Sequence, residues 1–196
     1  YPKNTPKGRK QPHQKNIQWD EISKCWTGPF IMSRFNSAIV RRTNALLNFK
    51  YGKDFIYDEV SVIPKKPLSK IRAQCYALGL GLFTGMLYFR LTRWLLSKTI
   101  LPKPGQGPSE ESRKNGFFIL DLIGAQSNNT LKVTVSCGSD PGYSGTALMI
   151  GESAVCLALD EELLPQNFGI LTPATAMGKT LANRLKKAGM EFEYSN

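Results

Sequence analysis

Two glycine-rich segments are the first places in this sequence where residue type and spacing could do chemistry. Residues 77–89 read ALGLGLFTGMLYF and contain G-x-G-x-x-x-G, and further along Gly138, Gly142 and Gly145 precede an apolar stretch. Glycines between a strand and a helix let backbone amides approach a phosphate closely. Both segments are therefore tested first as nucleotide loops.

The first segment does not fit a dinucleotide fingerprint, which needs a strand before the glycines, a helix after them and an acid at the end of the next strand. Residues 69–74 show no alternation, and the first acid after the glycines is Glu110. On a helix, Ala77, Gly81 and Gly85 fall at i, i+4 and i+8. This spacing predicts a face without bulky side chains, on which another backbone can pack.

Charge and aromatic placement leave two interpretations of this apolar segment open. Residues 73–89 carry no charge, and Lys or Arg stands on both sides of them. Tyr76, Tyr88 and Trp94 lie near the ends, as interfacial aromatics do. Residues 68–98 are therefore predicted to form one long apolar helix. It is either buried in a core or dimer contact, or it lies at a membrane surface.

The second glycine segment favours a turn over an anion site. Asp140 lies inside the loop, and the strand before it is predicted to belong to a hairpin, so an Asp140-Pro141-Gly142 turn leading into a helix is the favoured interpretation. Glu152 is the only charge between Ala147 and Leu159. We expect it to pair with an arginine or to face solvent.

The elements around these segments predict an α+β fold. It has a mixed, largely antiparallel sheet with flanking helices and one long apolar helix, in a domain spanning residues 17–196. Residues 1–16 are predicted to be a basic disordered arm or linker. Helices are expected at 37–51 and 144–159 and after Thr172, and strands at 55–63, 117–124, 131–137 and 190–194, with a hairpin tip at 125–130.

Charge and cysteine usage limit the partners. The net charge is +11, and residues 1–53 hold eleven basic residues against two acids. Such a balance favours anionic partners, but no nucleic-acid-binding motif accompanies it, so nucleic acid is not expected. The cysteines are too far apart for a CxxC pair and His13 is the only histidine, so no metal site is expected. Scattered thiols indicate an intracellular, reducing compartment.

A collinear series of short motifs runs through nearly everything after residue 26. Together they resemble the saccharopine dehydrogenase-like oxidoreductases, close to the branch called trans-acting enoyl reductases. The motifs are Gly28-Pro29-Phe30, then residues 39–46, 51–55, 101–110, 138–143, 151–154 and 169–178.

The resemblance implies that this chain is the C-terminal half of a longer protein. Members of that family carry an N-terminal Rossmann domain that binds NAD or NADP, and this chain has no counterpart of it. Their C-terminal domain is mixed α/β, closes over the cofactor cleft, supplies the substrate surface and often mediates dimerisation. The expected cofactor is therefore NAD or NADP, held by an N-terminal domain absent from this chain, with no metal.

Two functions follow from the resemblance. The leading hypothesis is the substrate-binding and dimerisation half of an NAD(P)-dependent, enoyl-reductase-like oxidoreductase acting on a hydrophobic, lipid-like substrate. The alternative is a non-catalytic subunit of this family that serves membrane association or complex assembly. Whether this chain is itself part of an enzyme stays open.

Under the leading hypothesis, four residues are candidates for the substrate or cofactor cleft. Arg41 or Arg42 could hold a phosphate or carboxylate, and Tyr143, beside Asp140, could donate a proton or a hydrogen bond. The structural alternatives are a solvated or paired arginine and a packed tyrosine. The resemblance assigns no catalytic residue.

Expected partners are the chain's own N-terminal Rossmann half, a second copy or larger complex, and a membrane or lipid surface. Eukaryotic relatives in this family resemble membrane- or lipid-droplet-associated proteins. The expected location is therefore intracellular, on a lipid droplet or organelle.

Overall fold

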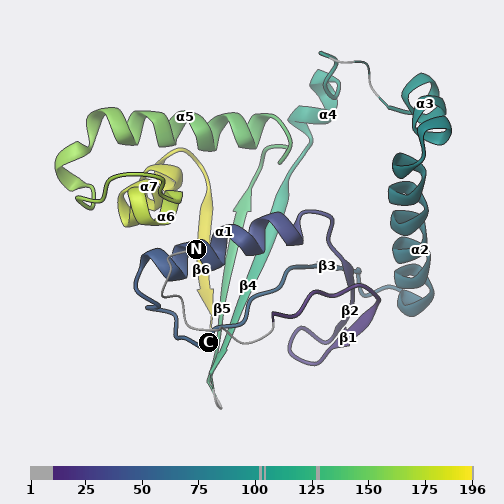
Figure 1. The fold of residues 1–196 in the computed structure, drawn as a ribbon, viewed down its shortest axis with the longest axis horizontal. Coiled ribbons are helices and arrows are strands. Elements are labelled where there is room, and N and C mark those ends of the chain that lie inside the picture. The colour runs from purple at the N-terminus through teal and green to yellow at the C-terminus, as the bar shows by residue number, and fades with distance from the viewer. Residues whose placement is uncertain (1–10, 102, 104, 127–128, 196) are drawn as a thin grey trace. The chain divides into compact units, whose positions relative to one another are not determined.

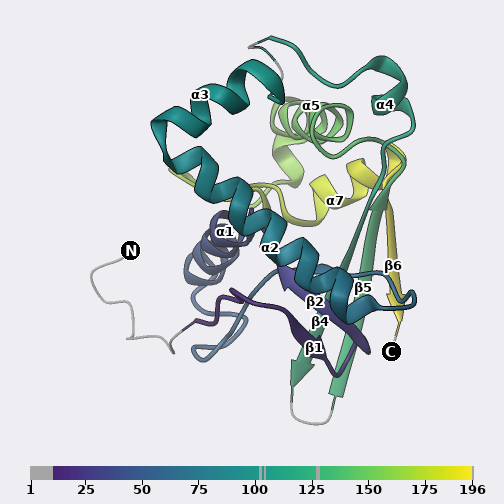
Figure 2. The ribbon, with the colours of Figure 1, turned by 90° about the vertical axis from the view of Figure 1, so that its right-hand side faces the viewer.

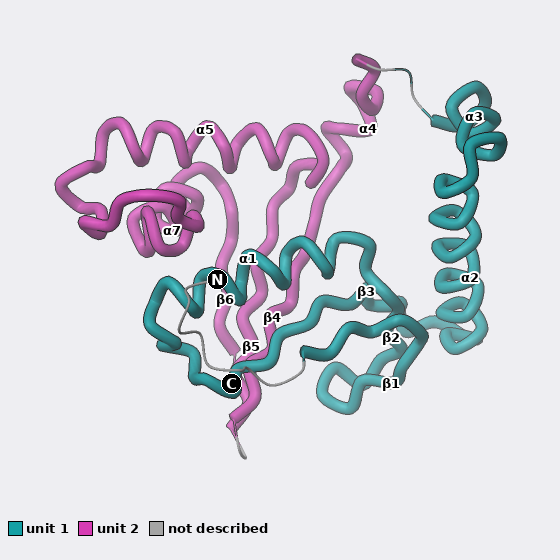
Figure 3. Tube along the Cα trace, in the orientation of Figure 1, with its two compact units in different colours: residues 1–103 teal, residues 104–196 magenta. Residues whose placement is uncertain are grey.

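The computed structural model describes residues 11–195 except 102, 104, 127 and 128. The chain forms two compact units, residues 1–103 and 104–196 (Figure 3). Each unit contains a three-stranded antiparallel sheet with flanking helices (Figure 1). The predicted α+β class with antiparallel pairing is confirmed, although the strands form two small sheets and not one.

The sheet of unit 1 consists of β1 (Gln18–Asp20), β2 (Cys25–Pro29) and β3 (Val60–Val62), in that order. Trp19 pairs with Trp26 across β1 and β2, and their rings meet edge to face with centroids 5.7 Å apart. Such aromatic cross-strand pairs stabilise a hairpin. The strand expected at 55–63 is shorter, because the Gln11 side chain bonds the Phe55 carbonyl and the Tyr57 amide.

Helix α1 (Ser33–Leu46) begins and ends earlier than the predicted 37–51. The amide of the Asn44 side chain explains its end, since it donates to the Gly52 carbonyl (3.0 Å) and accepts the Tyr51 amide hydrogen (2.9 Å). Asn48 adopts a left-handed conformation with φ 53°. This side chain therefore organises a turn that replaces the last predicted turn of helix.

The predicted single long apolar helix across residues 68–98 is wrong. The segment folds as α2 (Ser69–Tyr88) and α3 (Arg90–Thr99), which meet at the extended residue Phe89 (Figure 2). The Thr92 hydroxyl donates a hydrogen bond to the Met86 carbonyl. In an unbroken helix, this carbonyl would accept a hydrogen bond from the amide of residue 90. Within the described residues, no helix combines the length and apolar character that crossing a membrane requires.

The first half of α2 is attached to the sheet of unit 1. Ala73 is fully buried, and the Tyr76 hydroxyl donates to the Pro29 carbonyl (3.2 Å) and contacts the Ser61 hydroxyl (2.9 Å). The Lys70 ammonium lies 5.5 Å from the centre of a Trp26 ring. The second half of α2 is mostly exposed, so the helix is held from one end.

Unit 2 is built on the long hairpin that the sequence predicts. Its strands run antiparallel, with Phe118 opposite Cys137 and Gln126 opposite Asn129, and the middle of the predicted tip lies outside the described residues. The strand order is β4-β5-β6. The elements are α4 (Glu110–Lys114), β4 (Phe118–Gln126), β5 (Asn129–Cys137), α5 (Ser144–Leu159), a 3-10 turn (Glu161–Leu163), α6 (Pro173–Ala176), α7 (Gly178–Lys187) and β6 (Glu191–Ser195).

The register of this sheet gives it one apolar face. Successive side chains of a strand point to opposite faces, so Leu120 shares a face with its partner Val135 and with Phe192, which pairs with Val135 on β6. The other face carries polar residues, including Asp121 opposite Thr134. The members of the apolar face are Phe118, Leu120, Leu122, Leu131, Val133, Val135, Cys137, Phe192 and Tyr194.

The helices of unit 2 share a small apolar core. Cys156 on α5 is packed with Met177 and Leu181 of the C-terminal helices, and partly buried apolar side chains surround them. Thr172 and the Thr175 side chain form a reciprocal cap at the start of α6, as the sequence predicts for Thr172. Met177 lies between α6 and α7, and Gly178, with φ 51°, begins α7.

Gly116 should tolerate no side chain. A Cβ there would lie 2.4 Å from the Asp140 Cβ and 2.7 Å from its Cα, so Gly116→Ala forces backbone to move. We expect it to lower the free energy of unfolding by about 1–3 kcal/mol. Urea denaturation measures this. Gly138→Ala is the control, because a Cβ there meets nothing within 4 Å, and equal stability of both variants would contradict the close approach.

Candidate functional site

Asp140 organises the start of α5. Its Oδ1 accepts hydrogen bonds from the amides of Gly142 and Tyr143, both at 3.0 Å, and its Oδ2 accepts one from the Ser144 amide at 2.7 Å. These amides are the donors with which a helix N-terminus would bind an anion. The protein's own carboxylate occupies them, as the favoured turn interpretation predicts.

The same hydrogen bonds keep Asp140 ionised. The bond from the Ser144 amide, followed by those from Tyr143 and Gly142, holds the pKa of the Asp140 carboxyl below its usual value. Burial of the side chain opposes this effect, but the lowering is the net result. The carboxylate is therefore a fixed anchor at neutral pH.

Glycines around Asp140 serve close packing. A Cβ on Gly145 would lie 2.9 Å from the Asp140 carbonyl oxygen and 3.4 Å from the Phe118 ring, whereas Gly138 has open space. Gly142 would place a Cβ 3.3 Å from the Asp140 carboxylate. Of these three glycines, Gly145 is thus the one that the approach of another backbone segment requires.

Tyr143 presents its phenol beside this anchor. Its ring packs on the loop at Gly107, where a Cβ would lie 3.1 Å from the ring, and the side chain remains about half exposed. A phenol in this position can donate a hydrogen bond to a ligand. Of the four candidates from the sequence, Asp140 and Tyr143 are thus adjacent in one turn of unit 2.

The two arginine candidates lie in the other unit. Arg41 and Arg42 are half-buried neighbours on α1 of unit 1. The pairing of these arginines with Asp140 and Tyr143 in one cleft stays a prediction.

No described residue of unit 1 packs on the small-residue face of α2. Ala77 is half-buried, and a Cβ on Gly81 or Gly85 would meet nothing within 4 Å. A backbone that packs there would therefore come from outside the described part of unit 1. The packing face therefore also stays a prediction.

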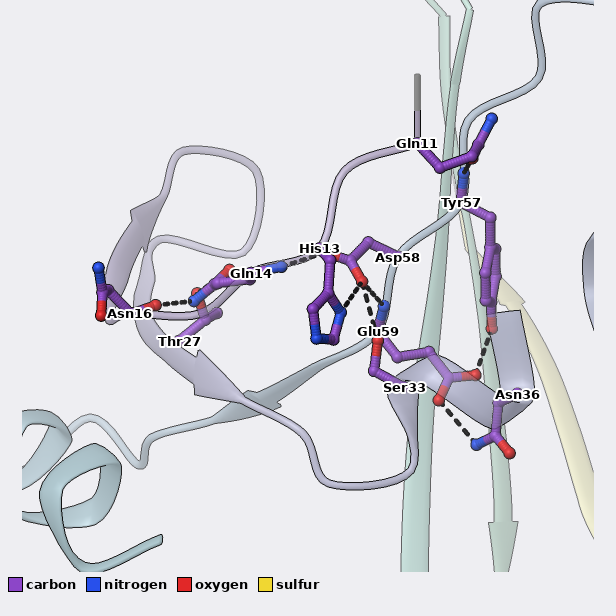
Figure 4. A network of polar contacts seen from close by, with 10 residues as sticks. All are labelled: Gln11, His13, Gln14, Asn16, Thr27, Ser33, Asn36, Tyr57, Asp58 and Glu59. Atoms are coloured by element: carbon purple, nitrogen blue, oxygen red, sulfur yellow. Dashed lines mark hydrogen bonds and ion pairs between the residues drawn. The ribbon is translucent and has the colours of Figure 1, made fainter. Parts of the chain in front are cut away.

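A polar network around Asp58 is the most extensive side-chain cluster of unit 1 that the sequence analysis did not single out (Figure 4). Asp58 accepts hydrogen bonds from the Gln14 amide (2.8 Å), the Ser33 hydroxyl (2.9 Å) and the Glu59 amide (3.0 Å). The His13 Nδ1 lies 3.9 Å from the same carboxylate. These bonds fix residues 11–16 against the start of α1.

Glu59 continues the network. It accepts hydrogen bonds from the Asn36 side chain and the Tyr57 hydroxyl, each at 2.7 Å. Burial raises the pKa of Tyr57, and the bond to Glu59 raises it further, so the phenol stays a donor.

Gln11 and Gln14 extend the network into the segment that the sequence assigned to a disordered arm. The Gln11 side chain donates to the Phe55 carbonyl (3.0 Å) and accepts from the Tyr57 amide (3.2 Å), and the Gln14 side chain donates to Thr27 (3.1 Å). Residues 1–10 of the predicted arm lie outside the described residues.

The network has the composition of a structural cluster. The Asp58 and Glu59 carboxylates each accept two or more hydrogen bonds from protein donors, and the Ser33 hydroxyl donates to Asp58 and not to an imidazole. An activated serine typically donates to an imidazole or an amine that acts as its general base. The signal available in the sequence was an adjacent pair of acids inside the otherwise aromatic and aliphatic run FIYDEVSVI.

Glu152 pairs with an arginine, one of the two roles expected for it. Arg184 on α7 donates through Nε to Glu152 (2.8 Å) and through Nη1 to Asp160 (3.0 Å). These two ion pairs connect α7 to the middle of α5 and to the residue that follows α5. Cys156 lies fully buried between them, and burial, followed by the Asp160 charge, raises the pKa of its thiol. This cysteine is therefore not an activated nucleophile.

Metal-ligating groups do not gather in the described residues, where no cluster of three or more His, Cys, Asp or Glu could hold an ion. The cysteines Cys25, Cys75, Cys137 and Cys156 are all free thiols.

Comparison with known proteins identifies relatives over nearly the whole chain. The trans-acting enoyl reductase of Mycobacterium ulcerans is 36% identical over 173 residues, which is 87% of this chain and 41% of that protein. A Mycobacterium tuberculosis protein of the same name is 35% identical over 176 residues, with the same two shares. A second Mycobacterium tuberculosis protein, whose name also contains these words, is 35% identical over 179 residues, covering 88% and 42%.

This chain therefore spans about two fifths of the length of the curated relatives it matches. The similarity is thus to a part of proteins named trans-acting enoyl reductases. No protein-family model and no solved structure matches it.

The Asp140 anchor should make stability depend on pH. Since its pKa is lowered by folding, its contribution is present above the usual Asp pKa of about 3.9 and is lost as pH falls through the lowered value. We expect Asp140→Asn to lower Tm at pH 7, with the gap to wild type closing toward pH 3. Thermal denaturation measures both. The control is Glu162→Gln at an exposed position, and a constant gap at all pH values would refute the charged anchor.

The 196-residue chain by itself should not bind NADH or NADPH. One glycine segment lies within α2, and the Asp140 carboxylate occupies the amides of the other. Isothermal titration calorimetry should show no saturable heat. A saturable complex with a Kd in the micromolar range would overturn this expectation.

Proposed function

We propose that this chain is the substrate-binding part of an enoyl reductase that acts on a hydrophobic, lipid-like acyl substrate. Its similarity to trans-acting enoyl reductases across nearly its whole length carries the proposal. Membership of the saccharopine dehydrogenase-like oxidoreductases, which the sequence motifs resemble, is part of the same proposal.

The nucleotide would be bound outside these residues. The described glycine segments do not fit a dinucleotide, because one is helical and the other is closed by Asp140. NAD or NADP would therefore be held by a Rossmann half that belongs to the same longer protein. This chain would contribute the surface that binds and orients the substrate.

The apolar face of the β4-β5-β6 sheet is the surface that suits an acyl chain best. Leu120 and Leu131 on this face are 44% and 47% exposed, and Tyr194 at its edge is also exposed. The Lys186 ammonium lies over the Phe192 and Tyr194 rings, at 5.4 and 5.8 Å from their centres. A hydrocarbon chain along this face would remove apolar side chains from water.

Polar groups would fix the other end of the substrate. The Tyr143 phenol can donate a hydrogen bond to an acyl carbonyl, and its adjacent backbone is fixed by Asp140. Arg41 or Arg42 can hold a phosphate or carboxylate on the acyl carrier. These roles follow residue chemistry and remain part of the proposal.

A non-catalytic assembly subunit is the second candidate function. The observation that favours it is the exposed apolar side of α5, where Ile150 and Leu157 face outward on a helix with one charge. A second copy of this chain, or another subunit, would cover that side. In this case the chain would associate without binding an acyl substrate.

Binding of trans-2-hexadecenoyl-pantetheine by the 196-residue chain tests the first function. We expect saturable binding in calorimetry, and weak or no binding of the short trans-2-butenoyl analogue. Leu120→Gln should weaken binding about tenfold, because a buried leucine contributes about 1.5–3 kcal/mol. Ile119→Gln is the matched control, since Ile119 is exposed on the opposite face of the same strand.

Two outcomes would contradict the proposal. They are the absence of long-chain binding and an equal loss in both variants. A dimer in multi-angle light scattering together with no acyl binding would favour the assembly subunit instead.

A further inference from the structure

Helix α3 exposes an apolar stripe that no described residue of unit 1 covers. Leu91 is 76% and Trp94 58% exposed, and Leu95 beside them is exposed as well. Residues three and four apart share one side of a helix, so these three side chains form one stripe. Leu96, on a different side of the same helix, is only 2% exposed. The stripe is therefore not the side by which α3 is attached to the protein.

A basic stripe runs beside the apolar one. Arg90 and Arg93 are exposed and lie three residues apart on α3. Lys98 follows Trp94 by four residues, so its ammonium extends from within the apolar stripe. Long basic side chains can lay their methylene groups on an apolar surface while the charge reaches a polar layer. This arrangement is that of a helix lying in a membrane interface.

The chain around α3 has a one-sided charge. Residues 60–109 contain eight Lys or Arg and no Asp or Glu. These basic side chains therefore have no acidic residue within the same segment with which to form an ion pair. A surface rich in negative charge would attract them, at close to 1 kcal/mol for each basic residue near an anionic membrane, or roughly fivefold in affinity.

The bend at Phe89 makes α3 a separate element at the end of α2 (Figure 2). Tyr88 and Phe89, both exposed, meet edge to face there with ring centres 5.8 Å apart. Tyrosine and tryptophan are enriched at the headgroup level of membranes. With ten residues, α3 is about 15 Å long, half of what a hydrocarbon core requires. It can lie on a membrane but not cross it.

We infer that α3, with the bend before it, binds the headgroup layer of an anionic phospholipid membrane. Leu91, Trp94 and Leu95 enter the interface, while Arg90, Arg93 and Lys98 contact lipid phosphates and carboxylates. The exposed leucines and tryptophan favour a lipid surface over nucleic acid, whose backbone offers no apolar phase. The inference does not rest on the proposed reductase function, since it uses only unit 1.

Flotation of the 196-residue chain with vesicles tests this inference. We expect it to float with phosphatidylcholine vesicles containing roughly 30% phosphatidylserine and to float poorly with pure phosphatidylcholine. Arg90→Gln with Arg93→Gln should lower the partition constant about thirtyfold. Leu91→Ser with Trp94→Ser should abolish flotation, while circular dichroism stays unchanged. Raising the salt concentration should weaken binding of the wild type.

Matched controls remove equivalent residues from unit 2. Lys179→Gln with Lys187→Gln deletes two exposed charges of α7, and Leu163→Ser deletes an exposed leucine; both should float as wild type does. Equal flotation with neutral and anionic vesicles, or wild-type flotation of the α3 variants, would overturn the inference. So would preferential retention on duplex DNA in competition. Leu120→Gln should float normally, which separates this result from failure of the proposed function.

Discussion

The hydrogen bonds of one carboxylate, that of Asp140, fix the turn on which unit 2 depends. They join the end of β5 to the first turn of α5 and hold the backbone from which Tyr143 extends. Gly116 and Gly145 approach this turn so closely that neither position has room for a side chain. An ionised carboxylate with three amide donors is both a cap and a local neutralisation of the helix dipole. The start of α5 is therefore closed to external anions.

Unit 1 uses a similar device at a different place. Asp58 accepts three hydrogen bonds and thereby joins the segment before β1, the start of α1 and the segment before β3. The buried side chains of unit 1 include several polar ones, among them Thr27, Ser33 and Thr43. In this unit, hydrogen bonding positions the elements, while large apolar side chains of α2 and α3 remain at the surface.

The exposed apolar surfaces of the two units suit different ligands. The sheet face of unit 2 is mostly aliphatic and carries no charged residue, which suits an acyl chain. The stripe on α3 is narrow and bordered by arginines, which suits a headgroup layer. If both proposals hold, the same chain would contact the lipid phase and bind a substrate soluble in it, so the substrate need not cross water as a free monomer.

Local sequence signals determined the parts of this protein that depend on neighbours in the chain. The Asp140-Pro141-Gly142 turn, the bounds of α5 and the β4–β5 hairpin were predictable, because turn residues and periodicity act over a few positions. Tertiary structure decided what depends on distant groups. The Asn44 side chain bonds to residue 52, which lies after the end of α1, and α1 is therefore shorter than predicted. Asp58 accepts hydrogen bonds from residues 14 and 33, which are distant in the sequence. The helix breaks at Phe89, which is neither glycine nor proline, so local sequence does not predict the break. The hydrogen bond from the Thr92 hydroxyl replaces the lost helical bond, and it forms only when both helices are in place.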